Sequence, residues 1–182
     1  MKKIILTAVA VFAFSFANAQ DAKYGVKGGL NMASNSEDGA SSLVAIHLGG
    51  FAEFKINDKF AVQPELIYSA QGAKFSDAGV STTFNLNYIN IPVMAKYYVA
   101  DAFSLEAGPQ IGFLMSAKNG SLDYKEFCNS TDFGINLGAG YDLNEKMTLG
   151  FRYNMGMSDV LKDQQTGTSQ NSVIQLSFGY KF

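Results

Sequence analysis

The chain has 182 residues, of which 47% are hydrophobic and 16% are charged, and its formal net charge is −2. Nucleic-acid binding needs a clustered basic surface, so we expect no nucleic-acid partner. With one histidine and one cysteine, the chain has no metal-ligand spacing of the zinc-site kind, and we expect no cofactor. The 18 glycines and the 13% of aromatic residues are typical of short alternating strands bounded by turns.

The N-terminus has the pattern of an export signal. Two lysines follow the first methionine, residues 4–16 are apolar, and Ala17-Asn18-Ala19 gives the small-x-small pattern of a cleavage site. The apolar stretch is too short for a membrane-spanning helix, which needs roughly 20 residues. We therefore predict a signal peptide over residues 1–19, cleaved after Ala19, and one mature domain over residues 20–182.

Apolar and polar residues alternate about eight times along the mature chain, with the period of two that is typical of β-strands. The predicted strands cover residues 24–32, 43–56, 60–69, 84–99, 103–115, 132–142, 147–157 and 173–182. Within the fourth of these, the pattern changes parity near Tyr88 and Ile89, which predicts a β-bulge in that strand.

The predicted connections alternate in length. Tight turns are expected at 57–59, 100–102 and 144–146, and long polar loops at 33–42, 70–83, 116–131 and 158–171. Short turns at one end and long loops at the other are typical of bacterial outer-membrane barrels. We therefore predict an all-β fold, a closed antiparallel transmembrane β-barrel of about eight strands, with short periplasmic turns and long extracellular loops.

The composition of the two strand faces favours this barrel over a soluble β-sandwich. The polar face is mostly Gly, Ser, Asn and Thr, which suits the crowded interior of a small barrel better than a solvated surface. On the other face, aromatic residues are expected near both ends, as in the girdles of transmembrane barrels. They are Tyr24, Phe54, Phe60, Tyr97, Phe103, Tyr141, Tyr180 and Phe182 at the turn end, and Tyr68, Phe113 and Phe133 at the loop end.

Three prolines fall inside the predicted strands, namely Pro64, Pro92 and Pro109. Each removes a hydrogen-bond donor from the sheet, and a closed barrel has no free edge that could accommodate it. We therefore expect bulges or strand ends at these positions.

Several segments resemble the PorT-like outer-membrane β-barrel proteins. They are the signal ending in Ala19-Gln20, the YGVKGGLN opening at 24–31, the YINIPVMAKYY segment at 88–98 and the GAGY stretch at 138–141. The resemblance covers essentially the whole mature chain and implies an outer-membrane location. It also implies a link to a protein-secretion pathway for the family's namesake, but the motifs carry no activity.

Ionisable residues gather on the face that is predicted to point inward. They are Lys27, Glu53, Lys55, Glu65, Lys96, Glu106, Asp142, Arg152 and Lys181. Such a set can form a charged constriction or gate in a narrow pore, or a salt-bridged core that holds the barrel shut. We expect the second, because eight strands leave little free lumen.

Three other residues could carry chemistry. His47 could join Ser69 and Glu65 in a lipid-modifying hydrolase, but we expect it to be a hydrogen-bonded interior residue. Cys128 stands alone in the third long loop, as an unpaired thiol or as the site of an intermolecular disulfide. Phe182, an outward aromatic at the last position, resembles the signal that barrel-assembly machinery reads.

The favoured function is that of a non-enzymatic bacterial outer-membrane protein, either an envelope scaffold or a barrel whose long surface loops bind an unknown protein or surface ligand. A narrow porin or a secretion-pathway accessory barrel is the first alternative, and a lipid-modifying outer-membrane enzyme is the second. The expected partners are outer-membrane lipids and, through Phe182, the barrel-assembly machinery.

Overall fold

The structure is a computed structural model that describes residues 22–35, 40–77, 80–120, 122–162 and 169–182. The predicted signal peptide lies outside these residues. The long strands of the described ranges are β1 (Ala22–Asn35), β2 (Ala40–Asn57), β3 (Phe60–Asp77), β4 (Val80–Ala100), β5 (Phe103–Asn119), β7 (Thr131–Asp142), β8 (Met147–Asp159) and β9 (Gln170–Lys181). A two-residue strand, β6 (Leu122–Asp123), and a 3-10 helix, η1 (Lys125–Phe127), lie between β5 and β7.

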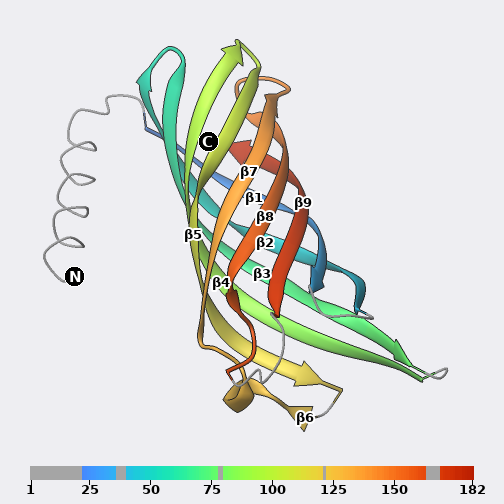
Figure 1. Cartoon of the computed structure of the whole chain (residues 1–182). Helices are drawn as coiled ribbons and strands as arrows, with labels where there is room; N and C mark the ends of the chain where they lie inside the picture. Colours follow the sequence, from blue (N-terminus) through green and yellow to red (C-terminus); the bar gives the residue numbers. More distant parts are fainter. Residues whose placement is uncertain (1–21, 36–39, 78–79, 121, 163–168) are drawn as a thin grey trace, which may run out of the picture.

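The long strands form a closed ring. Each strand is antiparallel to the next, β1 also pairs with β9, and the pairing of β4 with β5 completes the circuit. Within the described ranges the ring has eight strands, so the predicted closed antiparallel barrel is confirmed (Figure 1). No helix among the described residues is long and apolar enough to cross a membrane.

One end of the barrel carries the tight turns and is called the turn end. β2 and β3 are joined there by Asp58-Lys59, β4 and β5 by Asp101-Ala102, and β7 and β8 by residues 143–146. Asparagine side chains close two of these turns: the backbone N–H of Lys59 donates to Asn57 Oδ1 at 2.9 Å, and those of Lys146 and Met147 donate to Asn144 Oδ1, both at 2.9 Å. The three predicted tight turns are therefore confirmed.

The opposite end, called the loop end, carries β6 and η1 (Figure 1). Two of the predicted long loops are shorter than expected, because β3 continues to Asp77 before β4 starts at Val80, and β1 continues to Asn35 before β2 starts at Ala40. Polar residues can extend a hairpin, since its ladder consists of backbone groups that every residue except proline supplies. The β5–β7 and β8–β9 connections remain long.

The two faces of the wall have opposite chemistry. On β2, for example, Val44, Ile46 and Leu48 are about 60% exposed, whereas His47 and Glu53 between and beyond them are buried. All the aromatic residues predicted to face outward lie on the outer face. Three of them, Phe54, Phe60 and Tyr180, are only partly exposed there. The apolar surface is thus outside and the polar surface inside, the arrangement that a bilayer requires of a barrel.

The predicted bulge in the fourth strand is wrong, because the irregularity lies on the neighbouring strand. β4 keeps one parity from Leu86 to Tyr98, with Leu86, Tyr88 and Asn90 all buried. Tyr88 pairs with Leu114, and the preceding residue of β4 pairs with Ser116, so the extra residue, Met115, belongs to β5. The apolar pattern of β4 changes because Leu86 and Tyr88 face an apolar interior at the loop end.

The three prolines lie inside continuous strands, so the predicted bulges or strand ends at these positions are wrong. The β2–β3 ladder skips two residue pairs at Pro64, and the β3–β4 and β4–β5 ladders do the same at Pro92 and Pro109. Each ladder resumes in the register that it had before the gap. Each proline also keeps a paired position on its other neighbour. The loss of one donor therefore opens the sheet locally and does not end it.

Candidate functional site: ion pairs inside the barrel

Besides the buried Asp132 of β7, every strand of the described ring contributes one charged side chain to a connected set in the lumen. In strand order these are Lys27 (β1), Glu53 (β2), Glu65 (β3), Lys96 (β4), Glu106 (β5), Asp142 (β7), Arg152 (β8) and Lys181 (β9). Their inward direction follows from the period of two, which places every second residue of a strand on the lumen side. We call this set the lumen network; its four positive and four negative charges balance.

Arg152 and Glu65 form the middle of the lumen network. Arg152 Nη1 and Nη2 each donate to a different carboxylate oxygen of Glu65 at 2.9 Å, a bidentate pair. Arg152 Nη2 also lies 3.2 Å from Glu106 Oε2, and Lys27 Nζ lies 3.2 Å from both oxygens of Glu65. The Glu65 side chain is completely buried, so its charge depends on these partners.

The turn-end half continues the same chain of contacts. Lys96 Nζ lies 2.8 Å from Glu53 Oε2 and 3.5 Å from Glu106 Oε1. Lys181 Nζ lies 3.3 Å from the same Glu53 oxygen and 3.1 Å from Asp142 Oδ1. All eight members are thus joined in one unbroken series of ion pairs, which runs from Lys27 through Arg152 to Asp142.

Two predicted residues lie apart from the lumen network. Lys55 has the inward parity of β2 but sits at the exposed rim, with its Nζ 5.5 Å from the centre of the Tyr98 ring. Phe182 is 75% exposed at the turn end, where its backbone N–H donates to Tyr24 O at 2.9 Å and its ring lies 5.9 Å from that of Tyr180.

The lumen network leaves almost no free space. The void among Lys27, Gln63, Lys96 and their neighbours measures about 20 Å³, close to the minimum of roughly 10–15 Å³ that one water molecule needs. Glycine contributes to this fit, since a Cβ at Gly140 would lie 2.8 Å from Glu106 Oε1. In the described part of the barrel, this level is therefore packed with side chains.

An uncharged polar layer centres on Asn31, a residue that the sequence reasoning missed. His47 Nδ1 lies 2.8 Å from Asn31 Oδ1, and His47 Nε2 lies 2.9 Å from Ser177 Oγ. Asn31 Nδ2 donates to Ser69 Oγ at 2.9 Å. The suggested grouping of His47 with Ser69 and Glu65 is not formed, because His47 contacts Ser177 and Glu65 is held by the lumen network. The inward parity of Asn31 on β1 was the only sequence signal for it.

Ser177, His47 and Asn31 are hydrogen-bonded in series, as the nucleophile, the base and the orienting group are in a hydrolytic triad. The free space next to Ser177 is the same void of about 20 Å³, which is too small for an acyl substrate. Among the residues that the structure describes, no group of three or more His, Cys, Asp or Glu side chains could hold a metal ion. The three residues therefore have the geometry of a hydrolytic triad without a place for a substrate.

At the loop end, the two long connections are joined to each other. Asn129 donates from its backbone N–H to Val160 O at 2.8 Å, and from its side chain to Asp159 O at 2.7 Å and Leu161 O at 3.3 Å. The backbones of Cys128 and Leu161 also pair in an isolated antiparallel β-bridge. We call residues 127–129 and 159–162 the loop junction.

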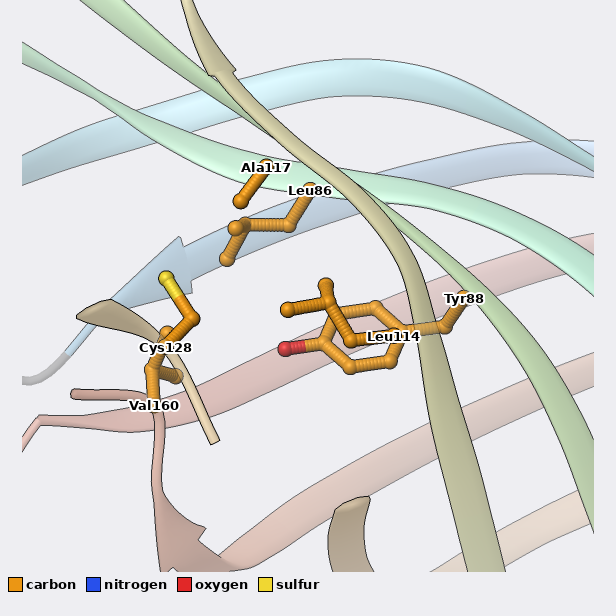
Figure 2. Close-up of a cluster of buried hydrophobic side chains, with 6 residues drawn as sticks. All are labelled: Leu86, Tyr88, Leu114, Ala117, Cys128 and Val160. Atoms are coloured by element: carbon orange, nitrogen blue, oxygen red, sulfur yellow. The ribbon is translucent and has the colours of Figure 1, made fainter. Parts of the chain in front are cut away.

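The loop junction holds Cys128 inside an apolar cluster rather than in an open loop. Figure 2 shows the cysteine sulfur directed toward Leu86 and Ala117, with Val160 beside it. Cys128 is only 2% exposed, and this burial raises the pKa of its thiol. The intermolecular disulfide considered from the sequence would therefore require the junction to open.

Comparison with known proteins gives one sequence family and many similar structures. Residues 17–162 match the family described as "Outer membrane protein beta-barrel domain". Neisserial surface protein A (NspA) matches with a TM-score of 0.62 and 18% identity over 90% of this chain and 100% of that chain. Ail of Yersinia pestis, crystallised with the heparin analogue sucrose octasulfate, matches with a TM-score of 0.55 and 17% identity over the same shares. No curated protein matches the chain, and at these identities the structural likeness shows the fold alone.

Proposed function

Because this chain belongs to the outer membrane protein beta-barrel domain family, we propose that it works as a sealed, non-enzymatic barrel that holds a binding surface at its loop end. The barrel resides in the outer membrane, and the proposal assigns its export to residues 1–19, with cleavage after Ala19. Under this proposal the wall is a scaffold, and the long β5–β7 and β8–β9 connections carry the interaction with a surface partner.

The lumen network is the observation that supports a sealed barrel. A conducting pore needs a continuous water-filled path, whereas the eight charges neutralise one another in contact and leave about 20 Å³ beside them. Moving an ion through this level would require buried ion pairs such as Arg152–Glu65 to separate, which leaves uncompensated charges in a space that admits almost no water.

Electrical recording in planar lipid bilayers tests the sealed state. We expect the purified protein to show no steady conductance. The matched variant Glu65→Ser/Arg152→Ser removes one negative and one positive side chain together, so it keeps the lumen neutral while opening space, and we expect brief current steps from it. Stable, reproducible conductance from the unaltered protein would favour the narrow-porin alternative instead.

Chemical labelling tests the non-enzymatic part of the proposal. Fluorophosphonate reagents react with serines that an adjacent base activates, as in a Ser–His pair. We expect no labelling of Ser177 in the folded protein, because the void beside it does not admit the reagent. Stoichiometric labelling that disappears in both Ser177→Ala and His47→Ala would show an active hydrolase site.

Two narrower points remain proposals. The YINIPVMAKYY segment at 88–98 supports kinship with the PorT-like proteins in particular. The exposed aromatic side chain of Phe182 at the end of the last strand supports a role in recognition by the barrel-assembly machinery.

A further inference from the structure

The barrel interior contains a sizeable cavity at the loop end, above the packed lumen layers. Its volume is about 480 Å³, against about 20 Å³ at the lumen network. Its wall includes the apolar residues Phe84, Leu86, Tyr124 and Val160, and the described residues that line it include no charged side chain. Figure 2 shows three of the lining residues, Leu86, Cys128 and Val160, gathered in one apolar cluster.

Asn171 supplies an unused polar group in this apolar wall. It lines the cavity from β9 and is completely buried. Its Nδ2 and Oδ1 make no hydrogen bond of good geometry with the described residues, and the Tyr88 hydroxyl is a neighbour that could form a weak hydrogen bond with one of them. A buried amide whose hydrogen-bonding capacity is mostly unfilled is unfavourable for folding, so its place in this wall points to a partner that enters the cavity.

We propose that this cavity binds a small, uncharged, mostly apolar molecule that carries one hydroxyl or similar group. The apolar wall would hold the body of the molecule. A hydroxyl oxygen can accept a hydrogen bond from Asn171 Nδ2 while its O–H donates to Asn171 Oδ1. The cavity volume lies within the range of roughly 300–1,000 Å³ that is usual for small-molecule sites, and the absence of charge in the described wall disfavours phosphorylated lipids and other ions.

The inference deepens the proposed binding role of the loop end, and it does not depend on whether the barrel conducts. The probe is 6-fluoro-2-naphthol, titrated into the full-length mature protein in phosphatidylcholine nanodiscs and followed by ¹⁹F NMR. We expect a separate, saturable signal at one site per barrel, which is absent from empty nanodiscs. If the probe only partitions into lipid without saturation, the cavity proposal is wrong. The sealed barrel is tested separately, by the conductance recordings in planar bilayers.

A matched pair of variants on β3 tests the location. Ala73 lines the cavity, whereas Ala70 lies on the opposite parity of the same strand, facing outward. We expect Ala73→Phe to fill the cavity and abolish the saturable signal, and Ala70→Phe to leave it unchanged. Equal binding by both variants, with both folded, would place the probe elsewhere and overturn the proposal.

A second probe tests the role of Asn171. Asn171→Leu keeps a side chain of similar size but removes the hydrogen-bonding amide. We expect it to weaken 6-fluoro-2-naphthol binding about fivefold or more, the value of one lost hydrogen bond, and to leave binding of 2-fluoro-6-methylnaphthalene unchanged. An equal effect on the two probes would refute recognition of the hydroxyl.

Discussion

Arg152 shows how a single side chain connects several strands of the barrel. From β8 it reaches Glu65 on β3 with two hydrogen bonds and Glu106 on β5 with a third. Both the guanidinium and the Glu65 carboxylate are buried, with 5% and 0% of their side chains exposed. A buried charge is tolerated only when it is paired with an opposite charge. Loss of one member of the lumen network therefore affects the strands that carry its partners.

Replacing Arg152 with Met should therefore destabilise the barrel strongly. We expect a loss of about 3–5 kcal/mol in the free energy of unfolding, the usual cost of leaving a buried charge without its partner. The control is Lys55→Met, a change of similar kind at the exposed rim of the lumen, for which we expect about 0.5 kcal/mol or less. Urea unfolding in lipid vesicles, followed by tyrosine fluorescence, measures both. Equal losses would mean that the lumen network contributes nothing specific.

At the scale of elements, the ring strands and the loop junction are held in place by different numbers of hydrogen bonds. The strands are held by ladders on both sides, which continue in register past three prolines. The junction is held by a few hydrogen bonds: Asn129 makes one from its backbone and two from its side chain, and Lys162 donates to Phe127 O and Glu126 O. Segments with few such bonds open locally at lower free energy than the rest of a protein.

Asn129→Ala should loosen the junction without unfolding the barrel. The adjacent Cys128 is the only cysteine of the chain, and its burial makes it a sensitive reporter of opening. Loss of two side-chain hydrogen bonds should raise its rate of maleimide labelling by about tenfold. Ser130→Ala, which changes an exposed neighbour, serves as the control. Unchanged labelling of Asn129→Ala would show that the junction is held by other contacts.

For the whole molecule, closure of the ring is the dominant property. Every long strand of the described chain pairs on both sides, with β1 and β9 completing the circuit between the two ends of the chain. A closed barrel has no edge strand from which unfolding could start, and its strands pair their backbone groups with both neighbours, as a bilayer requires, except where the ladders open at the three prolines. Stability therefore depends on the last strand as much as on the first.

A gel-mobility experiment tests this closure. We expect the detergent-solubilised protein to migrate faster when unheated than after boiling, because the closed barrel resists unfolding by the detergent and stays compact. A chain that ends at residue 169 lacks β9 and cannot close, so it should run at one position under both conditions. No heat-dependent shift of the full chain would argue against a closed barrel.

Local patterning was enough to predict most of the wall. Alternation with a period of two depends only on backbone geometry, so strand positions, the outward aromatic residues and the inward direction of residues such as Glu65 and Arg152 could be predicted from the sequence. The three tight turns followed from the same pattern. Where an apolar interior interrupted the simple contrast between the faces, at Leu86 and Tyr88, the same reasoning placed a bulge on the wrong strand.

The contacts inside the barrel were decided only by tertiary structure. Arg152 and Glu65 are separated by 87 positions in sequence, and their pairing depends on the register and tilt of every strand between them. The same holds for the exclusion of Lys55 from the lumen network, for the central position of Asn31 and for the cavity beside Asn171. A sequence pattern specifies the face on which a side chain lies, whereas closure of the ring determines which side chains meet across the lumen.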